Sequence, residues 1–314
     1  MSAPNEFEQI ARLYRPLTRG APEALGLLDD AAVMASRPGF DLVITKDTLV
    51  EGVHFPAGER PDLVARKLLR VNLSDLAAKG ADPYGYLLST AWPPGYGWAE
   101  RESFARGLDI DGEAFGLTLL GGDTVSTSGP LVVSATMLGW VPAGGMVRRA
   151  GAQDGDVLAV SGVIGDGGLG LKVVQNALDD PHGRLRARYT LPEPRVDLRD
   201  GLRQHAHAAA DVSDGLVADA WHIAEASRLG LVISLGTLPV SPEGRTWLAQ
   251  QSDPLAAMLF LATSGDDYEV VCATSLEGAA AMGMTVIGHF GGDGLVVLSD
   301  GKPVETGPGG WQHR

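Results

Sequence analysis

The fold is decided by the stretch Lys67-Leu68-Leu69-Arg70-Val71-Asn72-Leu73-Ser74-Asp75-Leu76-Ala77-Ala78-Lys79-Gly80. Most of its residues are apolar or good helix formers, Pro61 and Asp62 precede it as a start signal, and Gly80 suits a helix C-terminus. The pattern predicts a buried helix. Asn72 and Asp75 interrupt it three residues apart, so an amide and a carboxylate lie on one helical face. A helix with a solvated polar edge would show the same pattern.

Composition restricts the class of protein. With 314 residues, 45% of them hydrophobic and 20% charged, the chain is long enough for one large or two smaller globular domains. A formal net charge of −14 without a basic stripe argues against a nucleic-acid surface. The single cysteine, Cys272, lies in an apolar run and is interpreted as a buried rather than a catalytic thiol. Neither a signal peptide nor a membrane-spanning run is recognisable, so we expect a cytoplasmic protein.

Glycine-rich sequence near residue 150 predicts two domains, over 1–150 and 151–314. The first is expected to contain a helix over 6–19, strands over 41–45, 86–91 and 131–139, and a helix over 99–115. The second is expected to contain a strand over 157–162, a helix from about 168, a connecting loop over 181–200, a helix over 207–228, strands over 231–235, 285–288 and 294–298, and a helix over 242–262. This alternation is typical of an α/β fold.

Further carboxylates follow apolar runs or stand at helix starts, and with Asp75 they are Asp30, Asp47, Asp123, Asp211 and Asp214. Two unit charges about 4 Å apart repel by about 1 kcal/mol in water and about 4 kcal/mol at an effective dielectric constant of 20. If the fold gathers these groups, they must protonate or bind cations. Oxygen ligands without a His/Cys set favour Mg²⁺, which commonly completes its shell with phosphate oxygens and so indicates a nucleotide. Each aspartate alone is better explained as a helix cap or turn residue, but the six together are not.

Other sequence motifs give weaker evidence for a function. The run Gly165-Asp166-Gly167-Gly168-Leu169-Gly170 satisfies the dinucleotide pattern G-x-G-x-x-G between a strand and a helix. No strand ending in Asp or Glu follows about 20 residues later, which argues against a Rossmann site. The sequence contains neither a Walker A motif nor a G-x-S-x-G elbow. His205, His207 and His222 are interpreted as surface or helix residues rather than as metal ligands.

Seven segments together resemble the thiamine-monophosphate kinase family, in the superfamily of aminoimidazole ribonucleotide synthetase and selenophosphate synthetase. They are Asp29-Asp30-Ala31-Ala32-Val33, Asp47-Thr48-Leu49-Val50-Glu51-Gly52-Val53-His54-Phe55, Asn72-Leu73-Ser74-Asp75-Leu76-Ala77-Ala78-Lys79-Gly80-Ala81, Gly121-Gly122-Asp123-Thr124, Arg149-Ala150-Gly151-Ala152, Asp211-Val212-Ser213-Asp214-Gly215-Leu216 and Gly265-Asp266-Asp267-Tyr268-Glu269. The resemblance implies a two-domain α/β fold with mixed sheets. The N-terminal domain would bind ATP and Mg²⁺ and pair its sheet across a homodimer, and the C-terminal domain would close over nucleotide and substrate.

The resemblance also implies a reaction, in which ATP phosphorylates thiamine monophosphate to thiamine diphosphate by direct in-line transfer, without a covalent enzyme intermediate. Several Mg²⁺ ions would be held by Asp30, Thr45, Asp47, Asp75, Asp123, Asp211 and Asp214, with Asp47, Asp75 and Asp123 central to catalysis. ATP would contact Gly121, Gly122, Arg149 and Ser213. Thiamine monophosphate would contact His54, Asp266 and Trp311. A requirement for a monovalent cation is left open.

Three residues depart from the family pattern. Lys46 stands where Ser or Thr is usual, and either its charge replaces an ion or only its carbonyl matters. Leu28 replaces a glycine, and Asp266 replaces a glutamate. Among rival enzymes, selenophosphate synthetase needs an N-terminal cysteine that the first 55 residues lack, and aminoimidazole ribonucleotide synthetase lacks the EGVHF segment. A non-catalytic scaffold would bind ATP without a phosphate acceptor.

Overall fold

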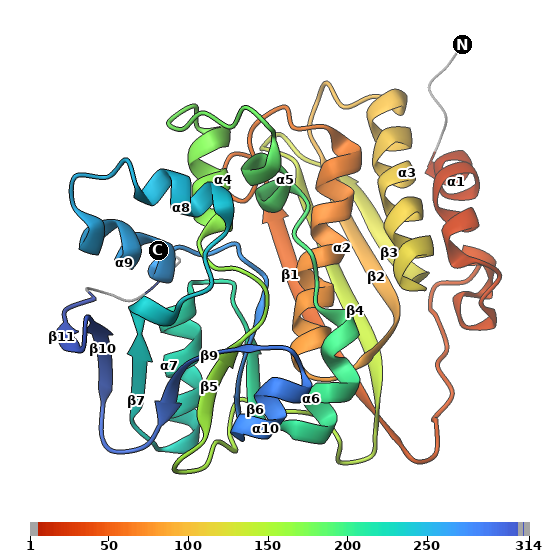
Figure 1. The fold of residues 1–314 in the computed structure, drawn as a ribbon. Coiled ribbons are helices and arrows are strands. Elements are labelled where there is room, and N and C mark those ends of the chain that lie inside the picture. The colour runs from red at the N-terminus through yellow and green to blue at the C-terminus, as the bar shows by residue number, and fades with distance from the viewer. Residues whose placement is uncertain (1–5, 307–309, 311–314) are drawn as a thin grey trace. The chain divides into compact units, whose positions relative to one another are not determined.

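The computed structural model describes residues 6–306 and 310, which form two compact units. Unit 1 comprises the described residues 6–76 and 81–144, and unit 2 comprises residues 77–80, 145–306 and 310. Each unit contains one mixed β-sheet with helices, which confirms the predicted α/β class with mixed sheets (Figure 1). Among the described residues, no helix is both long and apolar enough to cross a lipid bilayer.

Unit 1 contains α1 (Glu6–Gln9), η1 (Ile10–Tyr14), η2 (Arg15–Thr18), η3 (Pro22–Leu27), β1 (Phe40–Val50), α2 (Pro61–Ala78), β2 (Asp82–Trp92), α3 (Trp98–Phe115), β3 (Thr118–Ser126) and β4 (Val132–Pro142). The strand order is β1-β4-β2-β3. Strand β4 pairs antiparallel with both β1 and β2, whereas β2 and β3 are parallel.

Helix α2 is the predicted buried helix, and it begins at Pro61 as expected. Gly80 has a φ of +66°, and Ala81 N–H donates to Leu76 O at 2.9 Å, so the helix ends in the predicted glycine turn. The leucines at 68, 69, 73 and 76 are fully buried. Helices α2 and α3 lie side by side (Figure 1), and a Cβ on Gly107 of α3 would lie 2.3 Å from Asp62 O of α2. Close packing therefore fixes the helix that carries Asp75.

The sheet of unit 1 has one buried and one exposed face, because successive residues of a strand point to opposite sides. We call the side of Leu49, Val133 and Met137 the inner face, since these residues are 4%, 0% and 0% exposed. The opposite side, the outer face, carries Ile44 and Val125, which are 58% and 50% exposed. A side chain on this sheet therefore lies either on the buried inner face or on the exposed outer face.

Unit 1 differs from expectation in two places. The helix predicted over 6–19 is broken into α1, a π-helical turn and a 3-10 turn, because Pro16, the second residue of the 3-10 turn, has no N–H to continue an α-helix. Asp47 and the segment 121–124 were expected after strands but lie within β1 and β3. Pairing with β4 and β2 extends these strands through their polar residues.

Unit 2 contains β5 (Val157–Val160), α4 (Asp166–Val174), α5 (Arg184–Thr190), η4 (Val196–Leu198), α6 (Arg199–His205), β6 (Ala206–Asp211), α7 (Leu216–Ser227), β7 (Leu231–Ser234), η5 (Leu235–Thr237), α8 (Pro242–Leu248), α9 (Pro254–Thr263), β8 (Val270–Thr274), α10 (Leu276–Ala281), β9 (Thr285–Phe290), β10 (Leu295–Ser299) and β11 (Lys302–Val304). The sheet order is β11-β10-β7-β9-β5-β8-β6. Cys272 lies in β8 and is fully buried, which confirms its interpretation as a core thiol.

Unit 2 corrects three predictions. The expected loop over 181–200 contains α5, η4 and the start of α6. The helix expected over 242–262 is two helices, because Asp253 caps a new helix whose first residue is Pro254. The helix expected from 207 begins only at Leu216, because Gly215 has a φ of +127° and residues 206–211 pair with β8.

The contact between α2 and α3 gives a test of the packing. Gly107→Ala places a methyl group against the backbone of Asp62 and should lower the free energy of unfolding by about 1–3 kcal/mol. Gly129→Ala is the control, because its Cβ would meet only the Thr127 hydroxyl at 3.4 Å. Urea unfolding followed by circular dichroism measures both variants. Equal stability of the two variants would mean that α2 is not held by this contact.

Candidate active site

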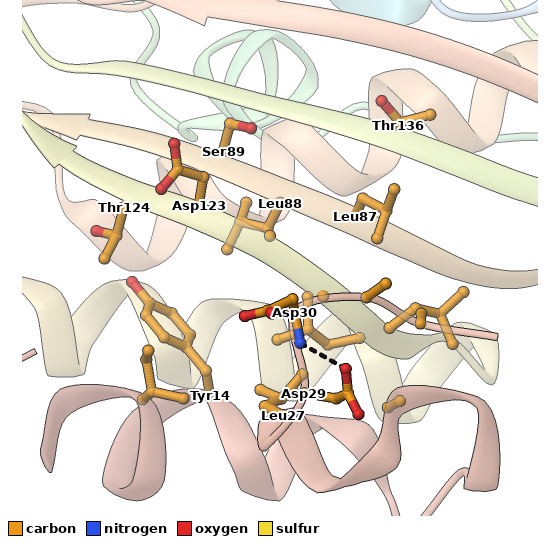
Figure 2. Close-up of a pocket in the computed structure, with 18 of the residues that line it drawn as sticks. Tyr14, Leu27, Asp29, Asp30, Leu87, Leu88, Ser89, Asp123, Thr124 and Thr136 are labelled. Atoms are coloured by element: carbon orange, nitrogen blue, oxygen red, sulfur yellow. Dashed lines mark hydrogen bonds between the residues drawn. The ribbon is translucent and has the colours of Figure 1, made fainter. Parts of the chain in front are cut away.

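A pocket of about 600 Å³ lies in unit 1 beside β2 and β3, and two of the predicted carboxylates line it. Asp123 projects from β3, and Asp30 comes from the segment that precedes β1 (Figure 2). Gly121 and Gly122 form part of the same wall. The structure therefore brings Asp30, Asp123 and the glycine pair to one cavity, although they are about 90 residues apart in sequence.

Gly122 is required by the sheet itself. A Cβ at this position would lie 2.0 Å from Leu88 O on β2, so any side chain would separate the two strands. A register shift between Tyr86 and Leu87 leaves Leu120 as an extra residue on β3 just before the glycines. Glycine at this position is therefore explained by close packing against the neighbouring strand.

The pocket has a polar group that sequence reasoning missed. Thr90 Oγ1 and Thr124 Oγ1 are 2.9 Å apart, and the buried Tyr14 side chain points from the helical N-terminal segment toward these strands (Figure 2). Burial raises the pKa of Tyr14 above its ordinary value, so its hydroxyl stays protonated. No local motif distinguishes these three hydroxyls, because they come from three elements that meet only in the fold.

A second group of predicted metal ligands lies where β1 passes α2. Thr45 Oγ1 donates a short hydrogen bond to Asp75 Oδ2. Burial and the charge of Asp75 raise the pKa of Asp47 to about 7, although Lys46 opposes the shift. The structure thus brings Thr45, Asp47 and Asp75 together as an oxygen-only set whose carboxylate repulsion Lys46 offsets only in part. Such a set fits a hard divalent cation, which would remove the repulsion.

Lys46 lowers this repulsion only in part. It follows Thr45 on β1 and therefore points to the outer face, away from Asp47 and Asp75. Its ammonium donates to Ser134 Oγ of β4 at 2.8 Å. The sequence left two roles open for Lys46: its charge replaces an ion beside Asp47, or only its carbonyl matters. In the single chain the Lys46 side chain does not lie beside Asp47 in place of an ion.

The segment after β1 is organised by Glu51, another residue that sequence reasoning did not single out. Glu51 accepts hydrogen bonds from Gly58 N at 2.9 Å, Leu131 N at 3.1 Å and the Tyr96 hydroxyl at 3.0 Å. These bonds lower the pKa of Glu51 against the raising effect of its partial burial. Within the loop, His54 Nδ1 accepts from Val50 N at 3.0 Å, which leaves the proton of a neutral ring on Nε2.

The remaining predicted metal ligands lie in unit 2. Asp211 is the last residue of β6, and Asp214 follows in the turn before α7. One oxygen of the buried Asp219 accepts hydrogen bonds from Ser213 N, Asp214 N and Gly215 N, at 3.0, 3.0 and 3.2 Å. Asp219 thereby fixes the turn that carries Ser213 and Asp214. Its spacing from them is that of an ordinary aspartate in the first turn of a helix, so sequence reasoning did not single it out.

A second loop, residues 264–269, is closely packed on this turn. Asp266 N donates to Ser213 O at 2.9 Å, and a Cβ on Gly265 would lie 2.2 Å from the same oxygen. Asp266 and Tyr268 both have a positive φ, of 65° and 51°, a conformation that costs energy for residues other than glycine. The position of Asp266 relative to Ser213 is therefore fixed by the backbone rather than by a flexible loop.

Two backbone N–H groups of the glycine run 165–170 are already bound by a side chain of the same protein. Asp267 accepts from Gly165 N at 2.8 Å and from Gly167 N at 2.9 Å, at the N-terminus of α4. A cofactor phosphate would need these same N–H groups. The glycines serve close packing, since a Cβ on Gly167 would lie 2.3 Å from the Asp266 backbone.

The predicted site residues thus form separate groups within the two units. In unit 1 they are the pocket with Asp30, Gly121, Gly122 and Asp123, the set Thr45, Asp47 and Asp75, and the loop of His54. In unit 2 they are Asp211, Ser213, Asp214 and Asp266, and Arg149 is exposed. Trp311 lies outside the described residues. Within the described part of this single chain, no three His, Cys, Asp or Glu side chains meet as a ready-made metal site.

Comparisons with known proteins agree with this organisation. Residues 28–141 match the family "AIR synthase related protein, N-terminal domain", and residues 153–299 match its C-terminal domain. The chain is 56% identical over 320 aligned residues to a thiamine-monophosphate kinase of Caulobacter vibrioides, covering 99% of this chain and 91% of the relative. A crystal structure of thiamine-monophosphate kinase from Stenotrophomonas maltophilia is 36% identical, with a TM-score of 0.82 over 97% of this chain and 99% of that one. A structure of AaThiL complexed with AMPPCP and TMP is 31% identical, with a TM-score of 0.79 over 89% of each chain.

The buried Asp267 predicts a pH dependence of stability. Burial raises its pKa to about 8 in the folded chain, above the ordinary value of 3.8. The folded chain therefore keeps a proton that the unfolded chain releases, and the contribution present below about pH 4 is lost as the pH rises to about 8. The destabilisation caused by Asp267→Asn should accordingly be larger at pH 5 than at pH 8 in urea unfolding. Asp253→Asn, at an exposed helix cap, is the control with no such trend. A pH-independent difference for Asp267→Asn would contradict the assignment.

Proposed function

The chain belongs to the thiamine-monophosphate kinase family, and from this premise we propose that it transfers the γ-phosphoryl group of ATP to the phosphate of thiamine monophosphate. The products are thiamine diphosphate and ADP. The observation that carries the proposal in this chain is the oxygen-only set of Thr45, Asp47 and Asp75, in which the pKa of Asp47 stays raised to about 7 although Lys46 opposes the shift. A reaction between two phosphates needs such a set.

The reaction does not require a strong general base. The acceptor is already an anionic phosphate oxygen, so the main barriers are the alignment and the mutual repulsion of two anions. We expect several Mg²⁺ ions to be held by Asp30, Thr45, Asp47, Asp75, Asp123, Asp211 and Asp214. Bound Mg²⁺ would neutralise phosphate charge and fix the phosphates in line. The described residues contain no group of three or more His, Cys, Asp or Glu side chains that could hold a metal ion, so we expect phosphate oxygens of the substrates to complete each coordination shell.

The ATP-binding residues are proposed from both units. Gly121 and Gly122 offer exposed backbone beside a pocket of about 600 Å³, a volume suited to a small molecule. Ser213 is held at fixed geometry by Asp219, and the exposed Arg149 has a guanidinium suited to a phosphate. The substrate side is proposed to use His54, whose neutral ring carries its proton on Nε2, together with Asp266 and Trp311.

We also propose that the protein is a homodimer formed through the outer face of the unit 1 sheet. Leu42, Ile44, Leu87 and Val125 on this face are 37%, 58%, 41% and 50% exposed. Neighbouring apolar side chains on one sheet face are unfavourable in water and are typical of an interface.

Turnover with thiamine monophosphate, ATP and Mg²⁺ tests the function directly. We expect thiamine diphosphate to form and to be detected as its thiochrome derivative after chromatography. Chelation of Mg²⁺ should abolish product formation, and excess Mg²⁺ should restore it. If ATP binds but no diphosphate forms, the protein is instead a nucleotide-binding scaffold of the same fold.

Asp123→Asn tests the assignment of the carboxylates. The change is nearly isosteric, so the fold should persist while kcat falls by at least about 100-fold, because a charge that serves the transition state is removed. Asp179→Asn removes an exposed carboxylate of unit 2 and should leave kcat unchanged. Circular dichroism and kcat are measured for both variants. Full activity of Asp123→Asn would refute its place in the metal site.

A further inference from the structure

The loop 264–269, which carries Asp266, is joined through its backbone to the turn that carries Ser213. Asp266 N donates to Ser213 O at 2.9 Å near the start of the loop. At the end of the loop, Val212 N donates to Glu269 O at 2.8 Å. One residue proposed to contact thiamine monophosphate and one proposed to contact ATP therefore belong to the same backbone arrangement.

The turn and the loop differ in what else holds them. The turn 213–215 has its own support, because the carboxylate of Asp219 accepts hydrogen bonds from all three of its N–H groups. The loop contains Asp266 and Tyr268 at positive φ, a conformation that persists only where the surroundings enforce it. The Tyr268 hydroxyl donates to Asp266 Oδ1 at 3.3 Å, so the backbone of both residues sets the direction of this carboxylate. The loop therefore needs a support of its own.

That support comes from Glu269, which is the last residue of the loop and is fully buried. Its carboxylate accepts from Arg195 Nε at 2.5 Å and Arg195 Nη2 at 2.6 Å, and from Arg188 Nη2 at 2.8 Å. Ser161 Oγ donates a further hydrogen bond at 2.6 Å. Arg188 Nη2 also donates to Asp267 O at 3.1 Å, so one guanidinium binds two residues of the loop. We call Arg188, Arg195 and Glu269 the clamp.

The clamp fixes the direction of the backbone rather than taking part in the reaction. Glu269 is 0% exposed and both of its carboxylate oxygens are bound, so it cannot contact a substrate. A buried ion pair contributes little net stability compared with apolar residues of similar size, but two N–H···O bonds from one guanidinium have a strict geometry. Gly162 leaves room for this geometry, because a Cβ at its position would overlap Glu269 and Arg195.

We propose that Arg188 and Arg195 are positioning residues for the acceptor substrate, because through Glu269 they hold the loop in the conformation that presents Asp266 to thiamine monophosphate. This role rests on the proposed function for the identity of the substrate. Since Asp219 fixes the turn independently, loss of the clamp should displace Asp266 and leave the turn in place. Thiamine monophosphate should then bind more weakly, whereas ATP binding should persist.

Hydrogen–deuterium exchange tests the clamp without reference to activity. Arg195→Lys keeps the positive charge but loses the bidentate geometry, so the protein should still fold. The amides of residues 264–269 should exchange about tenfold faster or more in this variant, whereas those of residues 213–215 should keep their natural rates. Arg184→Lys is the matched control without effect, because its ion pair with Glu243 lies on the surface of the same unit and the arginine is 68% exposed. Unchanged exchange over 264–269 in Arg195→Lys would overturn the proposal.

Steady-state kinetics separates substrate positioning from a general loss of structure. Arg188→Met and Arg195→Met should each raise the KM for thiamine monophosphate by about tenfold or more, while the KM for ATP and kcat stay within about threefold of the natural values. Arg184→Met should change none of these constants. If the methionine variants at 188 and 195 do not fold, Arg195→Lys must show the same selective rise, of about threefold or more. Equal increases of both KM values would indicate a merely structural role and overturn the proposal.

The clamp and the kinase can fail separately. Faster exchange over 264–269 in Arg195→Lys, in a protein that produces no thiamine diphosphate, would retain the clamp and refute the proposed substrate. Turnover by the natural protein, with unchanged exchange over this loop in the variant, would retain the kinase and refute the clamp.

Discussion

The repulsion between two half-buried carboxylates, those of Asp47 and Asp75, is the constraint on which the rest of this structure depends. Burial and the neighbouring charge of Asp75 disfavour the ionised form of Asp47 and raise its pKa to about 7. A chain tolerates such an arrangement only where its elements are held firmly, since the groups would otherwise move apart into water. Helix α2 provides that hold, because its leucines are fully buried and Gly107 lets α3 approach its first turn.

Other buried acids of the chain are satisfied by the chain itself, and this separates structural from chemical carboxylates. Glu269 is fully buried between Arg188 and Arg195, with N···O distances of 2.8 and 2.5 Å. Asp111 is held in the same way by Arg66 and Arg70. Asp219 and Asp267 accept backbone N–H groups that the adjoining helix starts cannot satisfy internally. Among the described residues, no ion pair with a guanidinium joins the set Thr45, Asp47 and Asp75, and the pKa of Asp47 stays raised.

Alternation along β1 places Thr45 and Asp47 on the inner face of the unit 1 sheet, beside α2, and Lys46 on the outer face. Lys46 stands between Thr45 and Asp47 in the sequence, but its side chain lies on the opposite side of the sheet. Its ammonium group donates instead to Ser134 Oγ on β4 at 2.8 Å.

The sequence by itself determined the α/β class, helix α2 with its start at Pro61 and its end at Gly80, and the identity of the family, because these depend on local periodicity, capping residues and ordered motifs. It did not determine that Asp47 and Gly122 lie inside strands, since strand length is set by pairing with neighbours remote in the sequence. It also missed Asp219, Asp267 and Tyr14, whose partners or neighbours come from other loops and strands. Only the tertiary structure decided which carboxylates have hydrogen-bond partners and which face of the sheet Lys46 occupies. The physical reason is that hydrogen-bond partners and burial depend on the residues that surround a side chain in the fold, not on the order of residues in the sequence.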